Sequence, residues 1–343
     1  MSGAPLRLGV VGLGRGQLFT TLLGDPSRGG LVAVCDVDPE RLDRAPPGAA
    51  RYADYDAFLR HPMDAVIVCT PLPLHASQTI AALKSGHHVL CEVPAASTLA
   101  ECEAIVRAVE ESGRKYMLAE NACFGELARA WSVAIDGGAL GELVYGEAEY
   151  VHDARELSRA KDGAATWRAT LPPIHYATHS LGPLLYLTGD RCTTATGLHS
   201  ASKVGGEHGT IDLEVGLFRT ERGALLKVLC GFAVERHPAF HWYVLYGTKG
   251  CLESARRFAD AGGDAYASEV AGAMRLQPLP RDVRGVAEGR MLDAFVDCIV
   301  RDARPPIDVY DAMDYTAPGL CAHLSAERGG EPVAIPSFRR GPR

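Results

Sequence analysis

A glycine-rich turn at the end of an apolar segment restricts the fold of this chain more than any other feature of its sequence. Residues 6–11, LRLGVV, predict a buried strand, and residues 17–24, QLFTTLLG, predict a helix. In a strand–turn–helix unit that binds a dinucleotide, the first glycine makes the tight turn and the second lets the pyrophosphate approach backbone N–H groups. The turn residues that we expect at a cofactor are Gly12, Gly14, Arg15, Gly16 and Gln17.

The third small residue of such a turn normally permits close packing of helix on strand. The GxGxxG spacing puts Gln17 at this place, with Gly16 one residue early. A second apolar run, residues 31–35, ends in Asp36, about 20 residues beyond the turn, where an acid accepts hydrogen bonds from the adenosine ribose. A carboxylate there repels a 2′-phosphate, so the sequence favours NAD over NADP. A turn residue at the end of a strand is the alternative interpretation of Asp36.

Strand and helix patterns alternate through the first 120 residues. Apolar runs at residues 65–69 and 88–91 are each followed by a helical pattern that ends at a glycine. This alternation predicts a doubly wound parallel sheet of the α/β class, a Rossmann domain over residues 1–122. Ligands of such sheets bind beyond the carboxyl ends of the strands. The residues that this places near the cofactor are Thr70, Pro71, His75, Glu92, Pro94 and Asn121.

After about residue 125 the pattern changes to alternating apolar and polar residues joined by short turns. Residues 212–234 and 240–254 are examples. They predict a second domain over residues 123–343, an α+β domain with a largely antiparallel open sheet, whose C-terminal helix can return to the first domain. The Ala/Gly-rich residues 259–272 predict a loop.

Charge and composition exclude several classes of protein. A net charge of −7 argues against a nucleic-acid or membrane-surface binder, and no apolar run reaches the length of a bilayer span. The first residues lack the pattern of a signal peptide, and the ten cysteines are scattered with no CxxC pair. We therefore expect a cytoplasmic protein without structural zinc.

Residues 174–183, IHYATHSLGP, carry two histidines four residues apart. On a helix, His175 and His179 would share one face, with Tyr176 three residues before the second. A metal site, a proton-transfer pair and a packed helix are the three interpretations. A metal site needs at least three ligands, and a tyrosine stands where a zinc protease has its acid, so we expect no metal. Outside this segment, His152, Asp153 and Arg168 are candidates for substrate contact, with a surface ion pair as the alternative for the arginine.

The order of these motifs resembles the Gfo/Idh/MocA oxidoreductases, the glucose–fructose oxidoreductase and inositol dehydrogenase family. The resemblance implies NAD, a polyhydroxylated small-molecule substrate, and a homodimer or homotetramer formed through the outer face of the second sheet. Two motifs depart from the family. Its Glu-Lys-Pro reads Glu92-Val93-Pro94 here, so the lysine that helps to move the hydroxyl proton is absent. Its later Asp, His and Asp positions read His175, His179 and Gly182.

These departures are similar to a branch of NAD-dependent glycosidases, whose Tyr-Pro-Thr-His-Gly-Leu-Gly-Pro motif corresponds to residues 176–183. The resemblance implies Tyr176 as a base and His179 as its partner near the reacting hydroxyl. His175 inherits no role and remains a candidate for substrate contact. Segments 119–121, 149–156 and 166–168 also resemble that branch, and they carry the four substrate candidates Asn121, His152, Asp153 and Arg168. In that branch, transient oxidation at C3 of the sugar acidifies the C2 proton, and the C1 substituent leaves by elimination.

Three functions remain open from the sequence. The first is an NAD-dependent oxidoreductase that acts on a hydroxyl of a sugar, glycoside or cyclitol. The second is redox-neutral glycoside hydrolysis, elimination or epimerisation through transient oxidation by bound NAD. The third is an NAD-binding protein without activity. Net release of NADH separates the first from the second, and NAD binding without turnover indicates the third.

Overall fold

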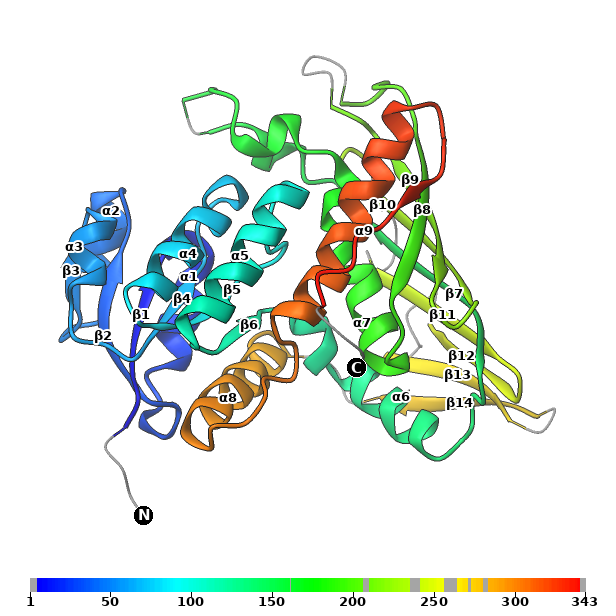
Figure 1. Ribbon diagram of the computed structural model, residues 1–343, viewed down its shortest axis with the longest axis horizontal. Coiled ribbons are helices and arrows are strands. Elements are labelled where there is room, and N and C mark those ends of the chain that lie inside the picture. Colours follow the sequence, from blue (N-terminus) through cyan, green and yellow to red (C-terminus); the bar gives the residue numbers. More distant parts are fainter. Residues whose placement is uncertain are drawn as a thin grey trace. The chain divides into compact units, whose positions relative to one another are not determined.

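The chain forms two compact units, which we describe separately. The structure, a computed structural model, describes residues 5–160, 162–205, 210–234, 241–255, 264–270, 273–279 and 283–339 (Figure 1). The first unit comprises Met1–Asn121 and Arg284–Met313, and the second comprises Ala122–Val283 and Asp314–Arg343. No helix among these described residues is long and apolar enough to cross a membrane.

A six-stranded parallel sheet forms the centre of the first unit, in the order β3-β2-β1-β4-β5-β6. The order reverses between β1 and β4, which in such folds marks the place of the ligand. The central β4 is buried along its whole length. The strands are β1 (Arg7–Val11), β2 (Gly30–Cys35), β3 (Ala50–Tyr52), β4 (Ala65–Val68), β5 (His88–Cys91) and β6 (Tyr116–Leu118).

Helices cover this sheet and begin and end where the sequence has capping residues. The Thr98 hydroxyl accepts the Glu101 N–H, and the Glu101 carboxylate accepts the Thr98 N–H, both at 3.1 Å; the helix that follows ends at Gly113 with φ +64°. The helices of this unit are α1 (Leu13–Leu22), α2 (Pro39–Asp43), α3 (Tyr55–Leu59), α4 (His75–Lys84), α5 (Leu99–Ser112) and α8 (Val286–Val300), with short 3₁₀ turns η1 (Pro26–Arg28) and η2 (Leu72–Leu74); the turn η3 (Asn121–Phe124) begins at Asn121 and continues into the second unit.

Residues 284–313 pack with the first unit, although they fall within the expected second domain of residues 123–343. Helix α8 buries Met291, Leu292 and Phe295. Beyond it, the Ile307 carbonyl accepts the Leu118 N–H at 3.1 Å and so continues the hydrogen bonding of β6. Helix α9 (Val309–Glu327) then carries the chain from the first unit into the second.

A nine-stranded sheet forms the second unit within the described residues. Its order is β14-β13-β12-β11-β7-β10-β9-β8-β15, and all neighbours pair antiparallel except β7 and β10. This confirms the predicted α+β architecture with a largely antiparallel sheet. The strands are β7 (Leu143–Val151), β8 (Cys192–His199), β9 (Glu214–Thr220), β10 (Leu225–Gly231), β11 (His241–Gly247), β12 (Gly250–Ser254), β13 (Asp264–Val270), β14 (Ala273–Leu279) and β15 (Val333–Ala334).

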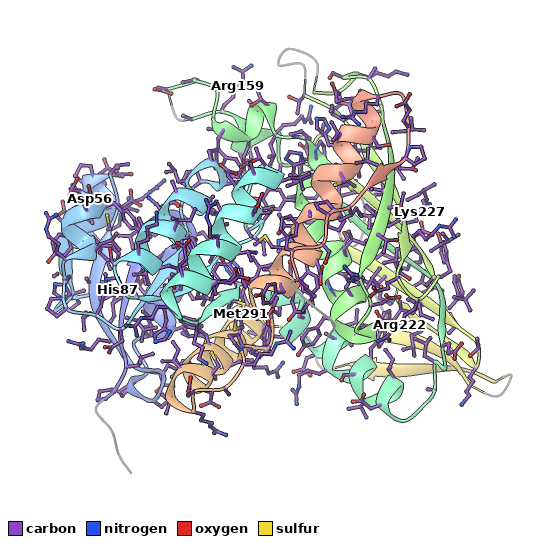
Figure 2. The ribbon with its side chains drawn as sticks, in the orientation of Figure 1. Asp56, His87, Arg159, Arg222, Lys227 and Met291 are labelled. Carbon is purple, nitrogen blue, oxygen red and sulfur yellow. The ribbon has the colours of Figure 1, made fainter. Side chains whose placement is uncertain are left out.

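One face of this sheet is covered by helices and the other is open. Gly197 of β8 lies against α9, where the Ser325 hydroxyl accepts its N–H at 3.0 Å. On the open face, Lys227 pairs with Glu147 at 2.7 Å (Figure 2). The helices of this unit are α6 (Glu126–Asp136), α7 (Thr178–Thr188) and the second part of α9, with turns η4 (Arg155–Ser158), η5 (Trp167–Thr170) and η6 (Pro173–Ala177) (Figure 1).

The prediction of a loop over residues 259–272 is wrong for its described part, because β13 pairs with both β12 and β14 there. Residues 264–270, DAYASEV, contain Asp, Ala and Glu, which are depleted in strands, and backbone hydrogen bonds to the two neighbouring strands hold them in place.

Candidate functional site

The glycine turn joins the carboxyl end of β1 to α1 in the first unit. Gly12 has φ +86°, a conformation that disfavours a side chain. A Cβ atom at Gly12 would also lie 2.6 Å from the backbone of Cys69 and Thr70, just after β4. The turn therefore needs glycine at this position, and it brings the ends of β1 and β4 into close contact.

Gly16 supplies the close packing of helix on strand. A Cβ atom there would lie 2.7 Å from Cγ1 of Val10, whereas Gln17, the residue at the expected place in the motif, is exposed. The imperfect spacing of the motif is thus compensated by a glycine one residue earlier. Gly14 is exposed, and a Cβ atom there would lie 3.4 Å from Nη1 of Arg41.

Asp36 lies at the end of β2 and is buried. Its carboxylate accepts the N–H groups of Leu13 at 2.7 Å and Asp38 at 2.9 Å, and it lies 3.5 Å from the guanidinium of Arg41. The carboxylate thus holds the first turn of α1. Because a carboxylate has about four acceptor positions, it keeps capacity for a ribose hydroxyl. The glycine turn, which carries no side chain at Gly12, fits a pyrophosphate, and the Asp36 carboxylate fits a ribose hydroxyl, so together they fit a dinucleotide.

His75 connects the loops that follow β4 and β5. Its ring nitrogens lie 2.7 Å from the Thr70 carbonyl and 2.8 Å from the Pro94 carbonyl, and the residue is 2% exposed. Burial disfavours the imidazolium, but Cys91 and the two carbonyl acceptors outweigh it and raise the pKa of His75 to about 9. Both ring nitrogens are used by the backbone, so His75 positions these loops. Thr70 itself binds the Gln78 side chain, and Pro71 precedes η2.

Arg15 connects two buried carboxylates. Its Nε atom lies 2.7 Å from Oε1 of Glu92, and its Nη2 atom lies 3.3 Å from Oε1 of Glu288. Although burial opposes it, these carboxylates raise the pKa of Arg15 above its usual range. The Asn121 amide also donates to Glu288, at 3.3 Å. Asn121, a predicted substrate residue, therefore lies in the first unit beside Glu288, a residue that no sequence motif indicated. Val93 is buried.

In the second unit, the segment around His175 and His179 is not one helix. It forms η6 up to Ala177, with Tyr176 outside helical geometry at φ −85° and ψ 17°, and then α7. The single helix on which both histidines would share one face is therefore not formed. His175 contacts His323 of α9 at 5.3 Å between ring centroids, whereas the His179 ring lies near Tyr150 at 5.2 Å. Burial and the neighbouring His323 lower the pKa of His175 to about 3, so its ring is neutral at physiological pH.

An aromatic and histidine cluster surrounds Tyr150. We define this aromatic cluster as Tyr150, His152, Tyr176, His179, Phe232, His241 and Tyr243. The Tyr150 ring stacks on His241 at 4.5 Å, and Tyr176 stacks on His179 at 6.1 Å. The hydroxyl of Tyr243 donates to the His179 carbonyl at 2.6 Å and lies 3.3 Å from Nδ1 of His241. The structure thus gathers three predicted residues, His152, Tyr176 and His179.

Four members of the aromatic cluster were not among the predicted site residues: Tyr150, Phe232, His241 and Tyr243. Sheet register explains how they meet, because His241 of β11 pairs with Tyr150 of β7, which pairs with Cys230 of β10. The two-residue spacing of Tyr150 and His152, and of His241 and Tyr243, is the sequence signal that could have found them, since both members of such a pair point to one face of a strand.

Beneath η6 lies a buried carboxylate, Glu214 of β9, which is 0% exposed. It accepts the Ile174 N–H at 3.3 Å and pairs with Nδ1 of His323 at 2.8 Å. Burial disfavours the charge on His323, but the hydrogen bond to Glu214 outweighs it and raises the pKa of His323. This pair supports the turn that carries His175 and Tyr176.

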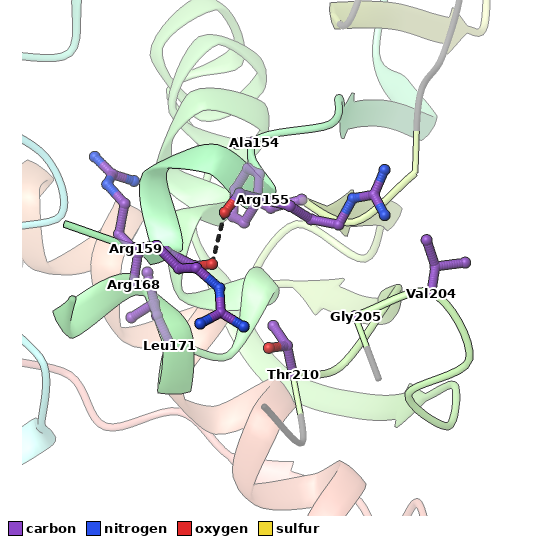
Figure 3. Close-up of a pocket in the computed structure, with 10 residues that line it drawn as sticks. Ala154, Arg155, Arg159, Arg168, Leu171, Val204, Gly205 and Thr210 are labelled. Atoms are coloured by element: carbon purple, nitrogen blue, oxygen red, sulfur yellow. Dashed lines mark hydrogen bonds between the residues drawn. The ribbon is translucent and has the colours of Figure 1, made fainter. Parts of the chain in front are cut away.

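Figure 3 shows a pocket of about 390 Å³ in the second unit. Its lining includes Phe232, which also belongs to the aromatic cluster. Arg168 lines the pocket, and its guanidinium lies 4.3 Å from the ring of Trp167 and 5.4 Å from that of Tyr176. Asp153 binds Arg155 through both carboxylate oxygens, at 2.9 and 2.6 Å, and this lowers the pKa of Asp153 to about 2. The Asp153 carboxylate is thus held by the guanidinium of Arg155.

Among the residues that the structure describes, no group of three or more His, Cys, Asp or Glu side chains could hold a metal.

Comparison with known proteins places both units in one family. The model described as "Oxidoreductase family, NAD-binding Rossmann fold" matches residues 6–120, and the GFO/IDH/MocA C-terminal domain matches residues 129–253. These matches confirm the predicted resemblance, the Rossmann domain and NAD as the cofactor.

Individual relatives share less than a third of their sequence with this chain. A "Glycosyl hydrolase family 109 protein" from Solibacter usitatus is 28% identical, over 98% of this chain and 89% of its own length. The structure of scyllo-inositol dehydrogenase from Lactobacillus casei with NAD(H) and scyllo-inositol has a TM-score of 0.78 at 19% identity, covering 96% of this chain and 99% of that one. Aldose-aldose oxidoreductase from Caulobacter crescentus, complexed with glycerol, has a TM-score of 0.80 at 21% identity, covering 96% of this chain and 100% of that one. At these identities the two structures show a shared fold.

Proposed function

The chain belongs to the Gfo/Idh/MocA oxidoreductase family, and from this premise we propose that it cleaves a glycoside by transient, NAD-dependent oxidation of a sugar hydroxyl. The reaction is redox-neutral overall. The relative named a glycosyl hydrolase family 109 protein supports glycoside chemistry, and the solved neighbours carry polyhydroxylated ligands.

The observation that carries this proposal is the location of the groups able to transfer protons. Val93 occupies the family's lysine position and can neither donate nor accept a proton, whereas the second unit brings Tyr176 and His179 together as stacked rings. His152 and His241 lie in the same cluster. Proton transfer at a sugar is therefore assigned to the aromatic cluster.

Each step has a group suited to it. NAD, when bound, takes up and later returns the hydride of the oxidised carbon. His179 accepts the proton of the hydroxyl that is oxidised, and Tyr176 removes the C2 proton, which the neighbouring ketone has made acidic. A histidine of the cluster donates a proton to the leaving C1 substituent, and water then adds at C1. The elimination and hydration steps balance without an external oxidant.

A phenol is a poor base near neutral pH unless a nearby positive charge stabilises its phenolate. The guanidinium of Arg168, 5.4 Å from the Tyr176 ring, provides such a charge. Arg168 makes no ion pair in the part of the chain that the structure describes, so no carboxylate there neutralises it. This supports Tyr176 as the base.

Deuterium incorporation tests the proposal. Glycosides of several configurations are incubated with the protein in D₂O, and the released sugars are analysed by mass spectrometry and NMR. Removal of the C2 proton predicts deuterium at C2 of the product, and simple dehydrogenation leaves C2 unlabelled. Tyr176→Phe should abolish labelling and cleavage. Tyr246→Phe, on the exposed part of β11, is the matched control and should retain both. Cleavage without label at C2 would contradict the proposal, and NAD binding without turnover of any glycoside would indicate an inactive protein.

We also propose a homodimer or homotetramer that assembles through the open face of the nine-stranded sheet. Leu198, Leu217, Leu225 and Tyr246 of this sheet are 45–54% exposed. Apolar side chains gathered on one sheet face favour a protein contact. Native mass spectrometry tests this, because Leu217→Arg should lower the oligomeric mass and an unchanged mass would contradict it.

All ten cysteines are free thiols, which supports residence in a reducing cytoplasm.

A further inference from the structure

Two charged side chains lie together at the end of β2, and the acid is the less accessible of the two. The Asp36 side chain is 4% exposed, whereas the Arg41 side chain is 47% exposed. The Nη1 atom of Arg41 lies 3.5 Å from Oδ2 of Asp36. A ligand that approaches this end of the sheet from solvent therefore meets a guanidinium beside the acid.

The fold of the segment that follows β2 places this guanidinium. Asp38 caps α2 by accepting the Glu40 N–H at 2.9 Å, and its other carboxylate oxygen lies 3.3 Å from Nε of Arg41. Helix α2 thus turns the Arg41 side chain back toward β2. The guanidinium also flanks the glycine turn, because a Cβ atom at Gly14 would lie 3.4 Å from its Nη1 atom.

The position of Arg41 matches one substituent of a bound dinucleotide. In folds of this kind the adenosine ribose lies between the glycine turn and the end of the second strand. Arg41 borders this space on both sides, through Gly14 and through Asp36. The 2′-position of this ribose carries a hydroxyl in NAD and a phosphate in NADP, so the guanidinium lies where only NADP has a charge.

Arg41 has hydrogen-bond donors left for such a phosphate. A guanidinium carries five N–H groups, and the contacts with Asp36 and Asp38 occupy two of them. No acceptor in the part of the chain that the structure describes contacts the other three. The Asp36 carboxylate, in contrast, already accepts the N–H groups of Leu13 and Asp38. Guanidinium groups bind phosphates through paired hydrogen bonds, which these remaining donors allow.

The acids around Arg41 limit how tightly a phosphate can bind. Asp36 and Asp38 both contact the guanidinium, and Asp54 lies within electrostatic reach of Cys35 at the end of β2. All three carboxylates repel a 2′-phosphate, so NAD remains the tighter ligand. A direct contact with the guanidinium offsets part of this repulsion.

We propose that Arg41 binds the 2′-phosphate of NADP and that the protein accepts NADP as a second dinucleotide, with lower affinity than NAD. Asp36 and Arg41 thus act in opposite directions on the choice of cofactor. The inference concerns the cofactor alone, so it stands or falls independently of glycoside cleavage.

Equilibrium binding tests the contact without any turnover. Full-length protein is freed of bound dinucleotide with activated charcoal and titrated calorimetrically with NAD, NADP, 5′-AMP and adenosine 2′,5′-bisphosphate at low salt. The last two ligands differ only in the 2′-phosphate. We expect NADP to bind in competition with NAD, and added NaCl to weaken NADP more than NAD. Failure of NADP to bind at millimolar concentration would overturn the inference.

The variant Arg41→Gln identifies the residue responsible. It should weaken NADP and the bisphosphate by at least about 10-fold, since each loses a charged hydrogen bond, and should leave the affinities for NAD and 5′-AMP nearly unchanged. Unchanged NAD binding also shows that the fold is intact. Equal weakening of NAD and NADP would overturn the inference, because it would place Arg41 on a part of the cofactor that the two share.

The matched control is Arg44→Gln at the end of the same helix. Arg44 is exposed and pairs with Glu40 at 3.6 Å, so the variant removes the same charge without removing the contact at Asp36. It should retain the wild-type ratio of the NADP and NAD dissociation constants. An equal loss of NADP affinity in both variants would overturn the inference, because it would indicate general surface charge.

Discussion

His75 makes the stability of the protein depend on pH in a direction that can be derived from the structure. The ring is 2% exposed and faces the carbonyls of Thr70 and Pro94 at 2.7 and 2.8 Å. Only the imidazolium can donate to both carbonyls, since a neutral ring has one N–H. Burial disfavours this charged form, but the neighbouring Cys91 and the two carbonyl acceptors outweigh burial and raise the pKa of His75 from 6.5 to about 9.

A folded-state pKa of about 9 against an unfolded value of 6.5 corresponds to about 3 kcal/mol of stability. Because the pKa is raised on folding, this contribution is fully present below about pH 6.5 and is lost as the pH rises through about 9. His75→Gln should therefore lower the free energy of unfolding most at about pH 6, and the deficit should shrink by about 3 kcal/mol by about pH 10.

Urea denaturation of the wild-type protein and the variant across this pH range measures the effect. Nitrogen NMR of the histidine side chains provides a second readout, because both ring nitrogens of His75 should carry protons at neutral pH. A deficit of constant size from acid to alkaline pH, or one ring nitrogen without a proton at neutral pH, would refute the reasoning.

Three further predictions concern the cofactor turn and the support of the substrate site. Gly12→Ala should destabilise the protein by about 2–5 kcal/mol in thermal denaturation and weaken NADH binding, because it combines positive-φ strain with overlap on backbone atoms. The control Gly48→Ala, at φ +93° with open space around it, should show the strain alone. Equal losses of stability in the two variants would contradict this reasoning. Asp36→Ser should reduce the preference for NAD over NADP in titration calorimetry, since it removes the carboxylate that repels a 2′-phosphate. An unchanged ratio of the NADP and NAD dissociation constants would show that Asp36 does not contact the adenosine ribose. Glu214→Gln should destabilise the protein by about 2–3 kcal/mol and lower the pKa of His323 in an NMR titration, because it removes a charged acceptor at 2.8 Å. An unchanged His323 titration would contradict the last of these.

The doubly wound parallel sheet of the first unit could be predicted from the sequence, because most of its signals are local. The glycine turn, the apolar strands and the cap formed by Thr98 and Glu101 each lie within a few residues of the element that they define. Gly16 shows the limit of motif spacing, since it packs on Val10 from a position one residue away from the expected one.

The substrate half of the site could be predicted only in part, because it depends on contacts between distant segments. Tyr150 and His241 are 91 residues apart in the sequence and lie opposite each other because β7 and β11 pair in this register. Neither segment alone indicates the other. The kink at Tyr176 separates His175 from His179, because the first packs on α9 and the second faces the sheet. Residues 284–313 join the first unit through burial and a backbone hydrogen bond that no motif marks.

The balance between glycoside cleavage and net reduction of NAD tests the central claim most directly. Protein purified without added cofactor is analysed for bound NAD(H) by native mass spectrometry and absorbance, and is then incubated with a panel of sugars and glycosides. We predict that NAD(H) copurifies and that glycoside is cleaved over many turnovers with no accumulation of NADH. An empty protein that forms NADH in equal amounts with an oxidised sugar would contradict the claim and establish a conventional dehydrogenase.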